Sequence, residues 1–172
     1  SNVGTISGTL TNPTNTAQTA LYSITPLSGS CTGGTFTMSV TVNPKATIAN
    51  NIATPICSAT RFSFSSVSTD IIPTGTTYTW SSPSVTGGIT GGTSASNVGT
   101  ISGTLTNPTN TAQTALYTIT PLSGNCTGVL FTLSVTVNPR AAIQDKVGDA
   151  ICSNNPFSYT PVNGVDGVVP DG

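Results

Sequence analysis

Apolar and polar residues alternate with a period of two in several stretches of this chain. The clearest are "FTMSVTVNPK", which starts at Phe36, and "FTLSVTVNPR", which starts at Phe131. Strict alternation over four to eight residues predicts a β-strand with one buried and one solvated face. Each stretch ends in a proline, Pro44 or Pro139, which removes a donor of the sheet ladder and suits a strand exit.

The stretch between these two prolines carries further strand signals. Apolar residues alternate around Phe62 and Phe64, and the pattern "TTYTWSS" places Tyr78 and Trp80 on one face. The remaining strands are expected near residues 46–48, 99–107, 114–122 and 129–139, with the last two forming a hairpin around "SGNCTG". About seven short strands separated by turn signals, without helical periodicity, predict an all-β, immunoglobulin-like sandwich.

The chain repeats itself with an offset of 95 residues. The first twenty residues return letter for letter at Ser96, and residues 1–44 closely match 96–139, whereas 45–69 match 140–164 weakly. A period of about 95 residues exceeds a solenoid turn and fits one immunoglobulin-like domain. The sequence therefore predicts tandem domains rather than a solenoid.

The strand exits at Pro44 and Pro139 set the expected phase of the repeat. Residues 45–139 are predicted to form one complete domain, residues 1–44 the C-terminal part of a preceding one, and residues 140–172 the N-terminal part of a following one. The alternative phase, with a domain at 1–95, would separate a predicted strand pair from its partner sheet. In the favoured phase the chain is a section of a longer array.

Composition narrows the possible functions. Charged residues make up only 5% of the chain, the formal net charge is −1, and histidine is absent. Nucleic-acid binding requires a basic surface, so that class is not expected. No apolar run is long enough to span a bilayer. Threonine-rich strand faces with few charges favour an extracellular, cell-surface location.

Each repeat contains two cysteines. In the complete domain these are Cys57, in "ICS", and Cys126, in "GNCTG". Paired cysteines in an oxidising compartment predict a disulfide, which would stabilise this loop by about 4 kcal/mol in the chain-entropy model. Four free thiols are the alternative, because the two cysteines flank different strands. No metal site is expected without histidine.

Catalytic chemistry is not expected either. The chain has no histidine or glutamate to act as a general base, and the complete domain contains a single acid, Asp70. Trp80 is predicted to be a core aromatic of the sandwich, with a sugar-stacking platform as the less favoured alternative. We therefore expect no enzyme activity and no cofactor.

All nine charged residues lie at 45–70 or 140–171, where the two copies diverge most. Drift of an exposed face explains such divergence without any function. The alternative is that some of them tune contacts between successive domains. The candidates are Lys45, Arg61, Asp70, Arg140, Asp145, Lys146 and Asp149.

Several motifs together resemble a known family. They are "PTGTTYTW", "TISGTLTNPTNTAQTALYTITPLSGNCTG" and "FTLSVTVNP". They are similar to the PKD-like, immunoglobulin-like repeats of large Bacteroidota surface adhesins of the gliding-motility type, which are associated with type IX secretion. The resemblance implies a stalk section that projects from the cell and carries load, with neighbouring repeats and an extracellular surface or polysaccharide as partners. A carbohydrate- or surface-binding module and a self-assembling filament subunit are the alternatives.

Overall fold

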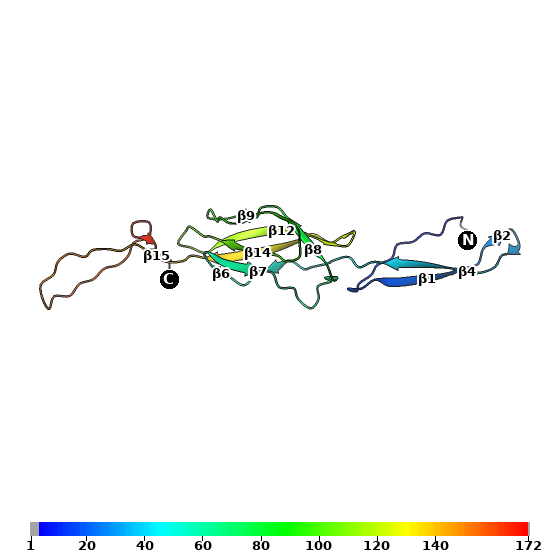
Figure 1. Cartoon of the computed structure of the whole chain (residues 1–172), viewed down its shortest axis with the longest axis horizontal. Helices are drawn as coiled ribbons and strands as arrows, with labels where there is room; N and C mark the ends of the chain where they lie inside the picture. Colours follow the sequence, from blue (N-terminus) through cyan, green and yellow to red (C-terminus); the bar gives the residue numbers. More distant parts are fainter. Residues whose placement is uncertain (1–3, 172) are drawn as a thin grey trace.

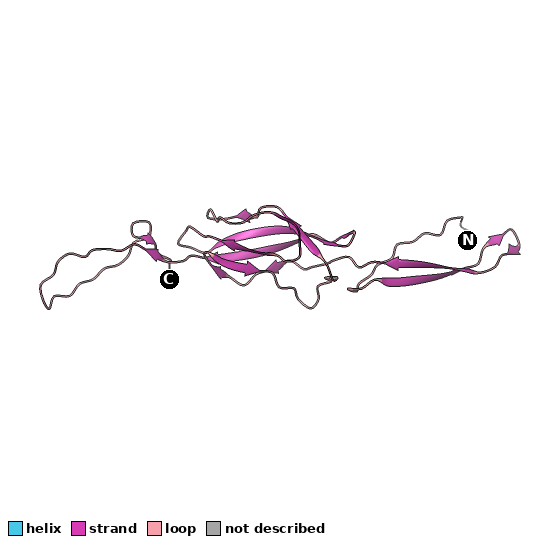
Figure 2. Cartoon of the chain, viewed as in Figure 1, coloured by secondary structure: helices cyan, strands magenta, loops and turns pink. Residues whose placement is uncertain are grey.

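The computed structural model describes residues 4–171, and these residues contain strands and loops but no helix (Figure 2). Residues 1–3 of the predicted first segment and residue 172 of the last lie outside the described residues. The chain is elongated, with a central body between two thinner segments (Figure 1). We refer to residues 4–44 as the N-terminal segment, 45–139 as the central body and 140–171 as the C-terminal segment. The predicted all-β class is confirmed.

The strands are numbered along the chain as in Figure 1. Their bounds are β1 Gln18–Ile24, β2 Leu27–Ser28, β3 Cys31–Thr32, β4 Phe36–Val42, β5 Asn51–Ile52, β6 Ile56–Cys57, β7 Thr60–Ser63, β8 Thr77–Trp80, β9 Ser84–Val85, β10 Ala95–Val98, β11 Ser102–Leu105, β12 Gln113–Ser123, β13 Cys126–Thr127, β14 Phe131–Asn138, β15 Ala142–Ile143 and β16 Gly167–Val168.

The larger sheet of the central body has the strand order β10-β8-β12-β14-β5. Strands β9 and β13 add to β12, and β6 adds to β14. The predicted hairpin is present: β12 and β14 are antiparallel from the pair Gln113 and Val137 to the pair Ile119 and Phe131. Their alternating apolar residues point to one face and are buried, because this face packs against the second sheet.

The second sheet pairs β7 with β11, and the hydrophobic core lies between the two sheets. Alternation fixes which residues enter this core, since successive side chains of a strand point to opposite faces. Within residues 4–171, all members of this core lie between Ile48 and Val137. The predicted strand at 46–48 is reduced to an isolated bridge between Thr47 and Ile71. The domain boundaries at Pro44 and Pro139 remain a prediction, which this placement of the core favours.

The N-terminal segment is a long hairpin of β1 and β4 with a short second pair, β2 and β3. Its register runs from Gln18 opposite Val42 to Ile24 opposite Phe36. These pairs are the β12–β14 pairs shifted by 95 residues. The hairpin therefore forms in the same register although no second sheet covers it in the described part of the chain.

The C-terminal segment is mostly loop, with one strand pair between β15 and β16. The pair Ala142–Val168 repeats the bridge Thr47–Ile71 of the central body. Gly167 precedes it with a φ of 120°, and a Cβ on this residue would lie 1.9 Å from the carbonyl oxygen of Ala142. Only glycine fits so close an approach of two backbones.

Candidate functional site

Two short connections join the three segments end to end at the predicted boundaries between repeats, and we call them the first and the second joint. At the first joint β4 ends at Val42 and Ala46 is already completely buried in the central body. The carbonyl oxygen of Ala46 accepts a hydrogen bond from the N–H of Val129 at 3.0 Å. At the second joint β14 ends at Asn138 and β15 begins at Ala142. Each connection therefore has only three residues between ordered positions, which limits how far the segments can separate.

The turn "NPTNT" is anchored to its hairpin by one asparagine in both repeats. Asn107 donates from Nδ2 to the carbonyl oxygens of Thr111 and Val137, both at 2.8 Å. Its Oδ1 accepts from the N–H and the hydroxyl of Thr109 at 2.9 and 2.8 Å. Asn12 makes the corresponding four bonds in the N-terminal segment. The side chain satisfies backbone groups that the turn leaves free, so the turn keeps one shape beside the joint.

The first and last strands of the central body run parallel. Strand β14 pairs with β5 and β6 in parallel register. Next to the ladder, the N–H of Ala53 donates to Ser134 and the N–H of Ser58 donates to Asn138, at 2.8 and 2.9 Å. A force applied to the two ends of the central body would enter at the start of β5 and leave at the end of β14, and would therefore slide these strands along each other. Such a force would act on all hydrogen bonds between β14 and its partners β5 and β6 at the same time. Separating the strands would then require these bonds to break together and not one after another.

The candidate contact residues do not form a joint through polar interactions. Four of them are exposed, namely Lys45, Arg140, Asp145 and Asp149. Arg61 donates to Ser102 Oγ at 2.6 Å within the central body. The hydrogen bonds and ion pairs that the predicted set makes in the described part of the chain all stay within one segment. Asp70 accepts from the N–H groups of Ala49 and Val67 at 3.0 and 2.9 Å. Its role there is to fix a loop of the central body.

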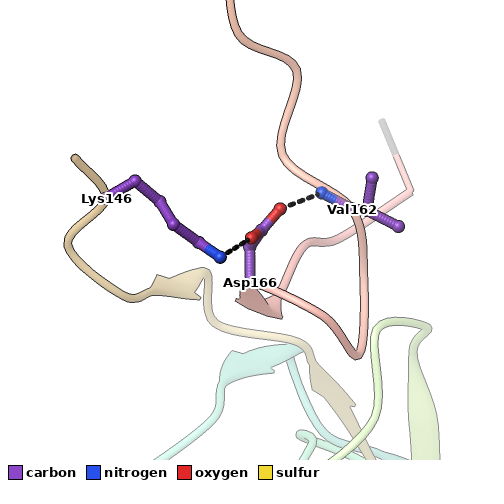
Figure 3. A network of polar contacts seen from close by, with 3 residues as sticks. All are labelled: Lys146, Val162 and Asp166. Atoms are coloured by element: carbon purple, nitrogen blue, oxygen red, sulfur yellow. Dashed lines mark hydrogen bonds and ion pairs between the residues drawn. The ribbon is translucent and has the colours of Figure 1, made fainter. Parts of the chain in front are cut away.

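Lys146 takes part in a loop contact of the C-terminal segment that corresponds to the Asp70 loop of the central body (Figure 3). Its Nζ lies 2.5 Å from Oδ1 of Asp166, and the other oxygen of Asp166 accepts from the N–H of Val162 at 2.8 Å. The hydrogen bond from Lys146 is the main reason that the pKa of Asp166 falls to about 2, with smaller contributions from Tyr159 and Val162. The same contact raises the pKa of Lys146.

Asp166 was missed by sequence reasoning, although a signal was present. Val162 is the copy of Val67, and an acid follows each valine, three residues later at Asp70 and four later at Asp166. The two carboxylates accept from equivalent N–H groups. Between this valine and the aligned stretch, "IIPTG" or "VVPDG", the second copy has two residues more than the first, of which one lies before Asp166 and the other is Gly167.

The predicted disulfide between Cys57 and Cys126 is not present, and all four cysteines are free. Cys57 lies opposite Asn138, at the end of β14, whereas Cys126 pairs with Ser123 beyond the start of β14. The whole of β14 separates them, and eight residues of strand span about 26 Å. A disulfide requires Cα atoms less than about 7 Å apart, so these two thiols cannot meet within one folded domain.

Trp80 lies in the core between the sheets. Its ring stands at 85° to that of Tyr117, and its indole N–H donates to the carbonyl oxygen of Thr93 at 3.0 Å. The central body also has a cleft of about 490 Å³ beside Arg61, Phe64 and Ser102. Phe62 and Tyr78, which reach this cleft, are themselves buried, so it exposes little aromatic surface for stacking on a sugar.

Residues 4–171 contain no cluster of three or more side chains suited to bind a metal ion. Nor does the described part of the chain form a helix of the length and hydropathy needed to cross a bilayer.

Comparison with known proteins accounts for most of the chain. No curated protein matches it. The family model of the PKD-like domain matches residues 1–46 and again residues 54–141. The first match ends just after the first joint, residues 47–53 lie between the two matches, and the second covers most of the central body. The sandwich, its repeated hairpin and these matches agree, and the chain belongs to the PKD-like domain family.

Proposed function

We propose that this chain is a stalk section of a long repetitive cell-surface adhesin of the Bacteroidota gliding type, and that its role is to project and carry load without catalysis. PKD-like domains are typical of extracellular and surface proteins, which gives the setting. In this proposal residues 45–139 form one complete domain of the array. Its partners are the neighbouring repeats, and the array as a whole reaches an extracellular surface or polysaccharide.

The parallel pairing of the terminal strands carries this proposal. Each joint enters the central body at one end of the pair formed by β14 with β5 and β6. The N–H of Thr132 adds a bond to Oδ1 of Asn50 at 2.8 Å, so contacts line the pair from one end to the other. Because the segments follow one another along the long axis, tension along the chain passes through this pair (Figure 1).

Stretching single molecules held at both ends tests the proposal. We expect one dominant unfolding event that lengthens the chain by roughly 300 Å, since each of the residues between the joints spans at most about 3.6 Å when extended. Ala53→Pro removes the N–H that bonds Ser134 and lowers the unfolding force.

Two controls make this test specific. In the described part of the chain the N–H of Thr54 makes no hydrogen bond, so Thr54→Pro leaves the force close to wild type. Phe62→Leu destabilises the second sheet at equilibrium and lowers the force less than Ala53→Pro does. If the chain extends without a resolved event, or if all three variants behave alike, the load-bearing role is wrong.

A filament subunit is the second candidate, because the flanking segments expose apolar side chains. Leu21 and Phe36 are exposed on the N-terminal hairpin, and Phe157 is exposed in the C-terminal segment. Two such surfaces from different chains would gain free energy by covering each other. Sedimentation over a concentration series distinguishes the candidates: a filament subunit grows with concentration, whereas an independent stalk section keeps one size.

A further inference from the structure

The second joint contains a contact between two residues that are far apart in sequence. Nδ2 of Asn110 donates to Oδ1 of Asp171 at 3.1 Å. The N–H of Asp171 donates in return to the carbonyl oxygen of Asn110 at 3.3 Å. Asn110 belongs to the "NPTNT" turn of the central body, and Asp171 follows Pro170 in the C-terminal segment. The two segments are therefore held to each other at two points beyond the chain connection.

The first joint brings the equivalent turns together without this contact. Asn15 is the copy of Asn110, and Thr74 occupies the position of Asp171 in the aligned turns "IIPTG" and "VVPDG". Asn15, Pro73 and Thr74 line one cleft of about 430 Å³, together with Asn43 and Pro44 of the connection. No hydrogen bond joins Asn15 to Thr74 in the part of the chain that the structure describes.

One of the two bonds depends on the side chain at this position, since Oδ1 of Asp171 accepts from Nδ2 of Asn110. An aspartate presents two acceptor oxygens to the amide of asparagine, whereas a threonine presents one hydroxyl on a shorter branch. The rest of the geometry is shared, because Asn12 and Asn107 hold the two "NPTNT" turns with the same bonds. Three-residue connections keep both turn pairs within reach of each other.

We infer that the "NPTNT" turn of each repeat docks on the residue that follows the proline of "IIPTG" or "VVPDG" in the next repeat, and that this residue, which we call X, decides whether the joint is latched. Aspartate at X, as at Asp171, closes the joint through Asn110. Threonine at X, as at Thr74, leaves the joint free to bend. An array with both residues at X thus combines stiff and flexible joints. The importance of this device rests on the proposed stalk function, but the contact itself does not.

Distances between spin labels on the full chain measure each joint. For the first joint the labels are on Cys31 and Cys57, both exposed and on different sides of it. For the second they are on Cys126 and on Gln144→Cys, in the central body and the C-terminal segment. The cysteines not used are replaced by serine in each case.

Exchanging residue X is expected to exchange the behaviour of the joints. Asp171→Thr and Asn110→Ala broaden the distance distribution across the second joint, with a fall of about 2- to 10-fold in the ratio of latched to unlatched molecules. Thr74→Asp narrows the distribution across the first joint, and Asn15→Ala in that background broadens it again. The matched controls are Asp149→Thr and Thr54→Asp, at exposed positions without a bond in the described residues, and neither changes its distribution.

Two results would overturn the inference. One is a second joint whose distribution is the same with Asp171 and with threonine there. The other is a first joint that Thr74→Asp leaves as broad as before. Neither result bears on the parallel strand pair, whose unfolding force is measured separately. Spin-label distances that do not respond to residue X, together with a high unfolding force, would contradict the latch and leave the stalk proposal intact. Distances that respond to residue X, together with a low unfolding force, would contradict the stalk proposal and leave the latch intact.

Discussion

The hairpin of β1 and β4 and the hairpin of β12 and β14 are two copies of nearly the same sequence in two different surroundings. Their backbone registers are identical after a shift of 95 residues. Their burial differs sharply: Phe36 is 48% exposed, whereas its copy Phe131 is 1% exposed. Local pairing is thus a property of the hairpin sequence, and burial is supplied by the rest of the domain.

The same contrast holds for the asparagine turns. Asn12 and Asn107 make the same four bonds, but only Asn107 is also tied to another strand region, because its N–H donates to Ser58 Oγ at 2.9 Å. The hydroxyl of Ser58 donates in turn to the carbonyl oxygen of Asn107 at 3.2 Å. One network is therefore solvated and local, and the other is buried and ties the turn to Ser58, which follows β6 at the same end of the sandwich. Equal substitutions in the two copies should have unequal effects.

The largest expected effect comes from removing the buried phenylalanine. Phe131→Ala leaves a cavity in the core and should lower the free energy of unfolding by about 3–5 kcal/mol. Phe36→Ala, at the exposed copy, should leave that free energy unchanged. Denaturant unfolding followed by the fluorescence of Trp80 measures the central body alone, because Trp80 is the only tryptophan. Equal losses for both substitutions would show that the two hairpins share one core.

Alkaline pH should weaken the central body through Tyr117. Burial raises the pKa of Tyr117 from 10.0 to about 12, so the folded protein holds the neutral phenol while the unfolded chain ionises. The stabilisation is complete below pH 10 and is lost as the pH rises toward 12, by up to about 3 kcal/mol. Denaturant unfolding at pH 9 to 12 measures this loss. Tyr117→Phe should reduce the loss of stability between pH 10 and 12. The loss that remains in this variant is assigned to Tyr78, whose pKa is raised mainly by burial and further by the charge of Asp70. A variant with the wild-type pH dependence would contradict this assignment.

Removing the turn asparagine should have an intermediate effect. Asn107→Ala leaves the carbonyl oxygen of Val137 and the N–H of Thr109 without their partner in a buried site, at a cost of about 2 kcal/mol. Asn12→Ala should cost less than about 1 kcal/mol, since water replaces the lost bonds at an exposed turn. Hydrogen exchange at the amides of Thr109 and Thr14 measures both losses. The comparison fails if Thr14 loses as much protection as Thr109.

The smallest effect is expected in the C-terminal segment at acid pH. The folded pKa of Asp166, about 2, lies below the ordinary value of 3.8, so its contacts contribute above pH 4 and are lost as the pH falls toward 2. The amide signal of Val162 should follow this titration in an NMR experiment, because that N–H donates to Asp166. Asp166→Asn should abolish the response while the unfolding of the central body stays as in wild type. A Val162 signal that does not move between pH 4 and 2 would contradict the contact.

The sequence by itself determined the repeat and the strands of the two long hairpins, which share one register. Alternation of apolar residues with a period of two decides which face of a strand can be buried, and a shift of one residue would turn every side chain to the wrong face. The pattern from Phe131 to Val137 therefore predicted both the strand and its core side chains. The repeated "NPTNTAQ" likewise forms its own bonds in both copies, because all the groups involved lie on one hairpin and its turn.

Only the tertiary structure decided which distant groups meet. Two cysteines in one domain suggested a disulfide, but the sheet order places Cys57 and Cys126 at opposite ends of β14. The charged residues suggested contacts between domains, yet the contact observed at the second joint joins Asn110 to Asp171, an acid outside that set. Such pairings depend on the order of strands in the sheets and on the path of the connections. Local sequence pattern contains neither, because both are settled by how complete sheets pack around a shared core.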